Sequence, residues 1–189
     1  NATVVNDAGL NFAASTVRNL AATATTGNIV DSGVLTVAGT SSFTTSQNNA
    51  DITLNNTNAL TGAVTLSTTG STGHATIDNG TTALNLATST VGGNLTLTSG
   101  HYIIDSSTVT VGGNLVATTD AANGSIHMDG LRVDGTVQLT TNGTGNATVV
   151  NDAGLNFVTA TVGGNLAATA TTGNMTDSGT LTITGTTTL

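Results

Sequence analysis

The stretch VGGNLTLTSGHYIIDSSTVTV, residues 91–111, decides the fold. It contains three short pieces, NLTLT, HYIID and STVTV, which are separated by Gly, Asn or Asp. Apolar and polar residues alternate within the pieces, as they do in a β-strand with one buried face. Because strands of about three to five residues are not stable alone, the stretch predicts one coil of a stack, in which each strand pairs in parallel with its copies in the neighbouring coils.

The first five residues of this stretch, VGGNL, define a corner motif that recurs along the chain. Each copy has an apolar anchor, a Gly two places later, and usually further apolar residues four and six places after the anchor. An earlier copy at Val17 has Arg18-Asn19 in place of Gly-Gly-Asn. The spacing between anchors, roughly 20–31 residues, predicts the length of one coil. The anchors are Val37, Leu60, Val91, Val111, Val133, Val162 and Ile183, and their glycines are Gly39, Gly62, Gly93, Gly113, Gly135, Gly164 and Gly185.

A second motif lies between the corner motifs and consists of a Gly followed by a short apolar stretch that ends at Asp. Together the two motifs predict short strands joined at Gly, Asn and Asp corners. Parallel crossovers are overwhelmingly right-handed. We therefore predict an all-β fold, a right-handed parallel β-helix of about eight coils of roughly 20–31 residues, forming a single β-solenoid segment over 1–189. The copies of the second motif are 27–31, 73–78, 100–105, 124–129 and 173–177, with a longer version at 145–152.

Repetition also occurs on a longer scale. NATVVNDAGLNF at 1–12 recurs identically at 146–157, and the similarity continues from 21–43 to 167–189. The two copies begin 145 residues apart, at Asn1 and Asn146. We expect the chain to be a segment of a longer protein built from this 145-residue unit.

The alternation within the strands predicts which side chains point into the coil. Thr, Ser and Asn occupy most of the other positions, where a β-branched or small polar side chain suits both strand geometry and water. The inward residues predicted for two successive coils are Leu95, Leu97, Ile104, Val109 and Val111, followed by Leu115, Ile126, Met128, Leu131 and Val133.

The glycines and asparagines of the corner motif are predicted to be structural. A corner that needs a positive φ in every coil would favour Gly there. Asn94 and Asn114 follow this corner in adjacent coils. They would stack about 4.8 Å apart and form a ladder of side-chain amides.

Composition excludes several classes of function. The net charge is −8, Lys and Glu are absent, and Arg18 and Arg132 are the only two cationic residues besides histidine. A nucleic-acid partner would need a basic face. No apolar run approaches the roughly 20 residues that span a bilayer, so neither nucleic acid nor a membrane span is expected. With no cysteine, no disulfide holds the fold.

The aspartates that end the second motif are the strongest candidates in the sequence for a binding site. Stacked carboxylates could bind a cation such as Ca²⁺, which takes oxygen ligands. The interpretation that we favour is that each Asp caps its own turn. We expect no cofactor. The candidate metal ligands are Asp31, Asp78, Asp105, Asp129 and Asp177, with Asp152 in the same row.

The three histidines are a second candidate. His74 and His101 follow the Gly of the second motif and are predicted to stack in neighbouring coils. A pair of imidazoles could hold a transition metal, but no third column of ligands accompanies them, which favours turn residues that face solvent. His127 lies within a strand and is expected to point outward.

Catalytic and ice-binding functions find less support in the sequence. Polysaccharide-active β-helix enzymes need paired acids and bases, and two Arg without Lys leave little for that, so the chain is not predicted to be an enzyme. Some solenoids bind ice through flat ranks of Thr. The pairs Thr96/Thr98, Thr108/Thr110 and Thr182/Thr184 are expected on different sides of the coil, in ranks broken by other residues.

VGGNLTLTSG (91–100) and VGGNLAATATTGNMTDSGTLTITGTTTL (162–189) are similar to the repeats of filamentous-haemagglutinin-like exoproteins, the large secreted partners of two-partner secretion systems. The resemblance covers essentially the whole chain. It implies a right-handed β-helix, export to the bacterial outer cell surface, and a role in adhesion or biofilm. The family's receptor-binding parts lie outside such shafts, so no binding residue is carried over.

We therefore expect the structural shaft of a bacterial surface adhesin or an extracellular fibre, without catalysis. Contact with a host or neighbouring cell would be made by regions outside this segment. Exposed strand edges at the ends of a solenoid invite end-to-end self-association into a filament. The alternatives are a solenoid that binds glycan, Ca²⁺ or ice and, with less support, a polysaccharide-active enzyme.

Overall fold

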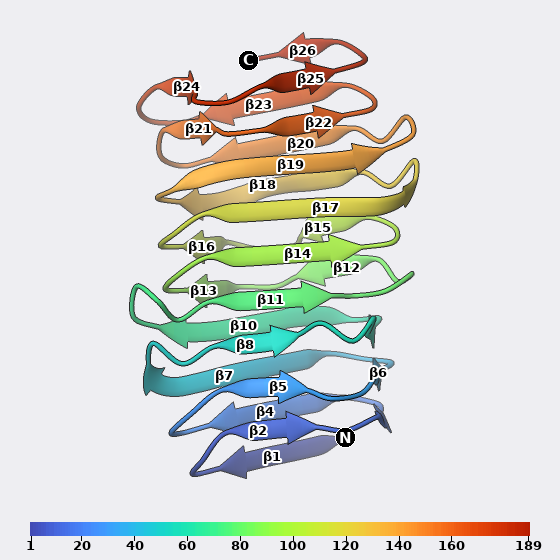
Figure 1. Cartoon of the computed structure of the whole chain (residues 1–189), viewed down its shortest axis with the longest axis vertical. Helices are drawn as coiled ribbons and strands as arrows, with labels where there is room; N and C mark the ends of the chain where they lie inside the picture. The colour runs from blue at the N-terminus through green and yellow to red at the C-terminus, as the bar shows by residue number, and fades with distance from the viewer.

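Twenty-six short strands and no helix make up the chain, and a computed structural model describes all residues 1–189. The strands pair only with equivalent strands of the coils above and below, always in parallel. Figure 1 shows the resulting stack, with the two termini at opposite ends. The all-β parallel solenoid predicted from the sequence is confirmed.

Two sheets, A and B, run along the stack, and a third, sheet C, is confined to its first coils. Sheet A contains β1 (Ala2–Asn6), β4 (Leu20–Ala24), β7 (Ser41–Asn48), β10 (Ala63–Thr69), β12 (Leu84–Leu86), β13 (Ser89–Val91), β15 (Ile103–Asp105), β16 (Val109–Val111), β18 (Ile126–Val133), β20 (Ala147–Asn151), β23 (Leu166–Ala170) and β26 (Thr187–Thr188). Sheet B contains β2 (Leu10–Phe12), β5 (Ile29–Asp31), β8 (Ile52–Leu54), β11 (Ala75–Asp78), β14 (Leu95–Ser99), β17 (Leu115–Ala122), β19 (Thr136–Asn142), β21 (Leu155–Phe157), β22 (Ala160–Val162), β24 (Met175–Asp177) and β25 (Leu181–Ile183). Sheet C contains β3 (Ser15–Val17), β6 (Leu35–Val37) and β9 (Ala59–Leu60).

The winding is right-handed. In Figure 1 the strands of sheet B run from left to right on the near side, those of sheet A run from right to left behind them, and the chain rises throughout. Ten strands follow one another along the main path of sheet A, which makes nine turns rather than the eight expected.

The coils are shorter and more uniform than the anchor spacing predicts. The shortest step from one coil to the next pairs Ala2 with Leu20, and no step is longer than the one that pairs Ile103 with Ile126. The longer spacings in the sequence arise because the corner motif changes its place on the coil. It leads into sheet A at Gly39, Gly62, Gly164 and Gly185, and into sheet B at Gly93, Gly113 and Gly135.

Each change of place lengthens the spacing between anchors by part of a coil. The amide of Leu60 donates to Oδ1 of Asn79, which lies directly above it in the next coil. The next anchor, Val91, follows only after the chain has passed one more side of that coil. The amide of Val133 likewise meets Asn151 before the chain reaches Val162. The wide spacings therefore measure one coil plus a part of the next.

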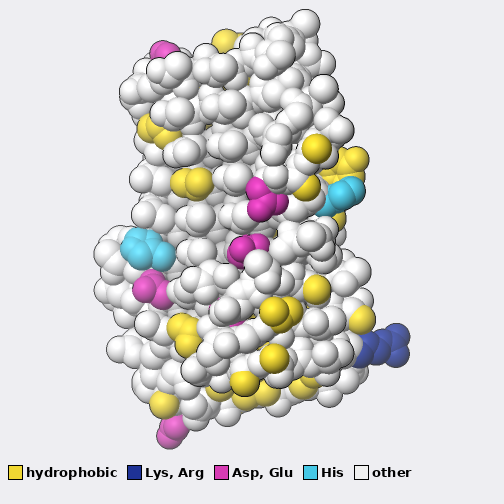
Figure 2. Space-filling model, turned by 45° about the vertical axis from the view of Figure 1, so that its right-hand side comes forward, with side chains coloured by type: hydrophobic (Ala, Val, Ile, Leu, Met, Phe, Trp, Pro, Cys, Tyr) yellow, Lys and Arg dark blue, Asp and Glu magenta, His cyan; other side chains and the backbone are white.

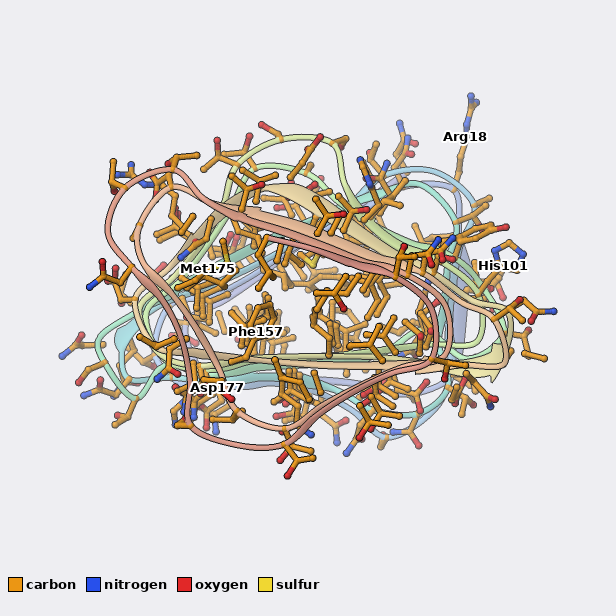
Figure 3. All side chains as sticks on the ribbon, turned by 90° about the horizontal axis from the view of Figure 1, so that it is seen from above. Arg18, His101, Phe157, Met175 and Asp177 are labelled. Carbon is orange, nitrogen blue, oxygen red and sulfur yellow. The ribbon has the colours of Figure 1, made fainter.

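A single core of 38 buried apolar residues runs through the stack, and Figure 3 shows it from above. The inward assignments predicted from the sequence are confirmed with one exception, Ile104. Ile103 is fully buried, Ile104 is half-buried on the outer side, and Asp105 points inward. The prediction was wrong by one residue because Asp105, the last residue of the second motif, faces inward. Since the side chains alternate, the residue before it faces outward and Ile103 faces inward.

Charged side chains are few on the outer surface, because only 6% of the residues are charged. Figure 2 shows scattered Asp and His side chains and one protruding cationic side chain on the face in view. Figure 3 shows Arg18 directed away from the coil. No helix of the structure is long and apolar enough to cross a bilayer.

Candidate functional site

A column of polar side chains follows the corner that leads into sheet B. In five successive coils a side-chain atom accepts a hydrogen bond from a backbone N–H of the coil above, so the column links coils outside the sheets. The acceptors are Asn28 Oδ1, Asp51 Oδ1, His74 Nδ1, Asn94 Oδ1 and Asn114 Oδ1, and the donors are the amides of Asp51, His74, Asn94, Asn114 and Thr136, at 2.8–2.9 Å.

The corner that leads into sheet A carries the same kind of column. Asn146 Oδ1 accepts from the amide of Asn165 at 2.7 Å, and Asn165 Oδ1 accepts from the amide of Thr186 at 2.8 Å. Near the other end Asn19 Oδ1 accepts from the amide of Thr40 at 2.9 Å. The Asn of the corner motif is thus a cross-coil acceptor wherever the motif sits.

All seven predicted corner glycines lie in bends between strands, but not for the predicted reason. None of them has a positive φ; that conformation occurs at five other glycines. A Cβ at Gly113 would instead collide with Oδ1 of Asn94 in the coil below, and a Cβ at Gly164 with Oδ1 of Asn146. At five of the seven positions the Gly leaves room for the Asn acceptor of the preceding coil, so that the Gly and the Asn act as a pair. At Gly93 the acceptor is His74, and at Gly62 the space is taken by the backbone of Gly39.

Asn94 and Asn114 lie in adjacent coils as predicted, but the predicted ladder of side-chain amides is wrong. Asn94 Oδ1 binds the backbone N–H of Asn114, and Asn114 Oδ1 binds that of Thr136. The donor in each of these bonds is a backbone N–H, which every residue except proline has. The column therefore needs only a side chain with an acceptor atom, and Asp51 and His74 serve as well as Asn.

The predicted stacking of His74 and His101 is wrong. His74 lies beneath Asn94, to whose amide its Nδ1 is bonded at 2.8 Å. His101 is exposed at another corner, packed edge-on against Tyr102 with ring centroids 4.1 Å apart. The two histidines follow the same motif, but that motif leads into sheet B at His74 and into sheet A at His101. His127 points outward as predicted, with Nε2 3.4 Å from Asp129 Oδ2.

The predicted row of aspartates is not formed either. Asp31, Asp78 and Asp177 end strands of sheet B, whereas Asp105 and Asp129 belong to sheet A. The second motif changes place together with the corner motif, so its carboxylates fall on two faces. No group of three or more His, Cys, Asp or Glu side chains lies close enough to hold a metal ion together.

Asp31 and Asp105 are the two buried carboxylates, and each binds the coil above. Asp31 accepts hydrogen bonds from the amides of Asn55 and Asn56 and from the side chains of Asn56 and Asn58, at 2.7–3.2 Å. Asp105 accepts from the amides of Asp129 and Gly130 at 3.0 and 2.9 Å. These bonds occupy the oxygen atoms that a cation would need.

Burial raises the pKa of Asp105 above its ordinary value of 3.8. The N–H donors of Gly130 and Asp129 act in the opposite direction, and the negative charge of Asp129 adds to the rise. Asp78 shows the local capping that we favoured from the sequence, since its Oδ1 accepts from the amide of Gly80 at 2.8 Å. Asp177 and Asp129 are exposed.

Three buried asparagines were missed in the sequence. Asn58, Asn79 and Asn151 are almost fully buried, and each Oδ1 accepts from a backbone N–H of the coil below, those of Leu35, Leu60 and Val133, at 2.7–2.8 Å. A signal was present for two of them. Asn79 and Asn151 lie one coil after the anchors Leu60 and Val133. At both places the spacing to the next anchor is unusually wide, and this wide spacing was the signal.

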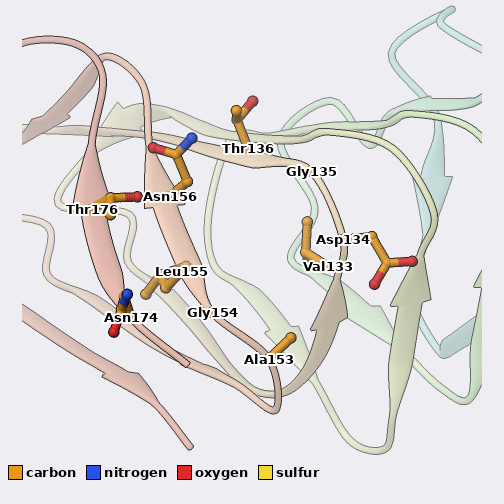
Figure 4. Close-up of a pocket in the computed structure, with 10 residues that line it drawn as sticks. All are labelled: Val133, Asp134, Gly135, Thr136, Ala153, Gly154, Leu155, Asn156, Asn174 and Thr176. Carbon is orange, nitrogen blue, oxygen red and sulfur yellow. The ribbon is translucent and has the colours of Figure 1, made fainter. Parts of the chain in front are cut away.

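The depressions of the surface are shallow. Figure 4 shows one of about 430 Å³ over the corner between β18 and β19 and the coils above it. Asp134 is the only titratable side chain among its ten lining residues, with Thr136, Asn156 and Thr176 among the polar ones. A second depression contains Asp78 and Asp120 beside Gly80 and Gly100.

A rank of five threonines crosses the outer face of sheet B. Thr98 and Thr182, which the sequence placed on different sides, belong to this one rank, while Thr110 lies in sheet A as expected. The hydroxyl-bearing side chains follow one another in successive coils, about 4.8 Å apart. The members are Thr98, Thr118, Thr140, Thr161 and Thr182, and Asp78 precedes them.

Comparison with known proteins identifies one family. A family model described as "Repeats of unknown function (DUF5649)" matches residues 1–67, 72–130 and 144–189. The matched segments include both copies of NATVVNDAGLNF and most of the coils between them. No curated protein and no solved structure matches the chain.

Proposed function

The chain belongs to the family described as repeats of unknown function (DUF5649), and we propose that it serves as a rigid structural shaft in a bacterial cell-surface adhesin or extracellular fibre. In this role it works outside the cell and catalyses no reaction. Its task is to hold a binding region, located elsewhere in the protein, at a distance from the cell surface.

The observation that carries the proposal is that the two buried carboxylates and the polar side chains of the corner columns are engaged in joining coils. The asparagines of the corner motif, His74, and the buried carboxylates of Asp31 and Asp105 all accept hydrogen bonds from the coil above. Such bonds add to the sheet pairing along the axis, where a shaft must resist bending and pulling. The sequence similarity to filamentous-haemagglutinin-like exoproteins supports the same role.

Length is the property that a shaft supplies. Nine turns at about 4.8 Å give a rod of about 43 Å, and each additional 145-residue unit would add seven coils, or about 34 Å. The number seven follows from sheet A, where β20 stands seven places after β1.

The test is to display on bacteria a small binding domain carried by one, two or three tandem copies of the 145-residue unit. We expect adhesion to a receptor beneath a polymer brush to rise with the number of copies, at equal surface expression. A matched control carries Ile103→Asp and Val111→Asp in each copy, which breaks the core without changing the length of the chain. Equal adhesion for all copy numbers would contradict the proposal.

The rank of threonines favours one alternative, a solenoid whose sheet B face binds an ordered surface such as ice or a crystalline glycan. This function predicts thermal hysteresis or binding to an insoluble polysaccharide by the purified chain. A Thr118→Lys, Thr140→Lys variant would abolish it and leave the fold intact, because both side chains point outward. Adhesion of bacteria that display the chain without a binding domain would also support this alternative over the shaft.

A further inference from the structure

The surface of the stack has a step where sheet C ends. Asn79 closes that sheet, because its Oδ1 accepts from the amide of Leu60 at 2.8 Å and its Nδ2 donates to the carbonyl of Leu60 at 3.2 Å. Above this point the chain turns directly from β11 to β12, from β14 to β15 and from β17 to β18. The step leaves a depression of about 580 Å³, which is lined by Thr57, Asp78, Gly80, Thr81, Gly100, Asp120 and Ala121.

Two carboxylates in this depression have oxygen atoms without a partner in the protein. Asp78 accepts from the amide of Gly80 through Oδ1 alone, at 2.8 Å. The side chain of Asp120 is exposed, and only the backbone carbonyl of this residue is bonded, to Nδ2 of Asn142 at 2.9 Å. Neither carboxylate forms an ion pair with an arginine. The depression therefore carries uncompensated negative charge and attracts a cationic ligand.

An exposed pair of aromatic rings adjoins the depression. Gly100, which lines it, is followed by His101 and Tyr102, whose rings pack edge-on with centroids 4.1 Å apart. Tyr102 is 44% exposed, whereas Phe43 and Phe157 are buried in the core. Only the backbones of the pair form hydrogen bonds, and Figure 3 shows His101 at the periphery of the stack. The rings thus offer an apolar face beside two free carboxylates.

We propose that this depression binds a glucosamine unit of a cationic polysaccharide. The ammonium group of the sugar forms charge-assisted hydrogen bonds with the carboxylates of Asp78 and Asp120. The apolar face of the pyranose ring covers the ring of Tyr102. The volume of the depression lies within the range of small-molecule sites, about 300–1,000 Å³. The inference goes beyond the role of a shaft, because it gives this segment a ligand of its own.

Charge and rigidity select this ligand over others. The net charge of −8 and the two carboxylates repel an anionic glycan, and a neutral sugar leaves the charge of the carboxylates without a counterpart. A basic peptide also carries ammonium groups. Its lysine side chains, however, are long and flexible and lose rotamer freedom on binding, whereas a pyranose ring is already rigid.

The experiment is isothermal titration calorimetry of the full chain with a fully deacetylated glucosamine hexamer. The N-acetylated hexamer and hexalysine are the comparison probes. We expect the deacetylated hexamer to bind about tenfold more tightly than either of them. Tyr102→Ala and Asp120→Asn should each weaken its binding by about fivefold or more. Both side chains are exposed and unbonded, so the variants keep the fold, which circular dichroism checks.

Asp134→Asn is the matched control. Asp134 is an exposed aspartate in the depression of Figure 4, which has no aromatic side chain among its lining residues. The substitution changes the net charge of the chain by the same amount as Asp120→Asn. We expect the affinity for the deacetylated hexamer to stay within about twofold of that of the unmodified chain.

Four outcomes would overturn the proposal. The deacetylated hexamer gives no heat of binding, or the N-acetylated hexamer binds equally well. An equal loss in the Asp134 variant would show attraction by net charge alone. Tighter binding of hexalysine would make a basic peptide the occupant of the depression instead.

Discussion

Residues 1–12 and 146–157 have the same sequence, form the same pair of strands and differ only in their neighbours. The first copy has a coil above it, whereas the second lies between two coils. Phe157 is 2% exposed and Val149 is fully buried, while their equivalents Phe12 and Val4 are only partly buried. The comparison teaches that these twelve residues do not carry a stability of their own, since a solenoid coil gains most of it from the coils on either side.

The largest difference is expected at the aromatic position. Phe157→Ala should lower the free energy of unfolding by about 3–5 kcal/mol, because it leaves a cavity in a closed core. Phe12→Ala should cost less than about half of this, because water already reaches part of the ring. Denaturation by guanidinium of both variants measures the difference. Equal losses would show that the two copies are equally packed.

The next difference concerns the buried amide. Asn151→Ala leaves the amide and the carbonyl of Val133 without partners inside the protein, which should cost about 2–3 kcal/mol. Asn6→Ala removes only the local bond to Gly9 and should cost about 1 kcal/mol or less. Chemical denaturation again measures both, and exchange of the Val133 amide should accelerate only in the Asn151 variant. An unchanged Val133 amide would contradict this assignment.

The corner motif gives a smaller difference. Gly164→Ala places a Cβ against Asn146 Oδ1 and against the carbonyl oxygen of Thr144, and should cost about 1–3 kcal/mol. Asn146→Gly removes the first of these contacts and leaves the second. The equivalent place in the first copy is Arg18, next to which Asn19 Nδ2 bonds to Asn1 Oδ1 at 2.7 Å, and Arg18→Ala should change stability by no more than about 0.5 kcal/mol. Adding Asn146→Gly to Gly164→Ala should restore part of the loss. A double variant with strictly additive losses would refute the pairing of Gly with Asn.

The smallest effect compares Asp105, which is buried beneath the coil of β18, with Asp7 at the exposed end. A pKa raised by folding means that the folded state binds more protons than the unfolded state, so stability falls as the pH rises from 3.8 through the raised pKa of Asp105. Asp105→Asn should remove this slope, and Asp7→Asn serves as its control. A slope that persists in the Asp105 variant would contradict the role of burial.

The fold was predictable because the corner motif and the alternation of apolar and polar residues recur in coil after coil. Leu95, Leu97 and Val111 face inward as the alternation requires, and the seven glycines lie at corners. The candidate site was less predictable. The corner motif moves from one corner to another, so residues with the same place in the motif, such as His74 and His101, do not stack.

The reason why the corner motif requires Gly could also not be predicted from the sequence of a single coil. A Cβ at Gly113 is excluded by Asn94 of the preceding coil, and only the stacking of coils brings the two together. The same holds for Asn151 and Val133. Asn151 stands where the next apolar anchor would be expected above Val133, and its Oδ1 accepts from the amide of Val133. Sequence patterns identified the elements, while the contacts between coils depended on register that the patterns leave open.

Residue-resolved hydrogen exchange of β1 and β20 tests the central claim most directly, since the two strands share the sequence ATVVN. If neighbouring coils supply the stability, the amides of 147–151 should exchange at least tenfold more slowly than those of 2–6 in the same molecule. Equal exchange rates in the two strands would contradict the account.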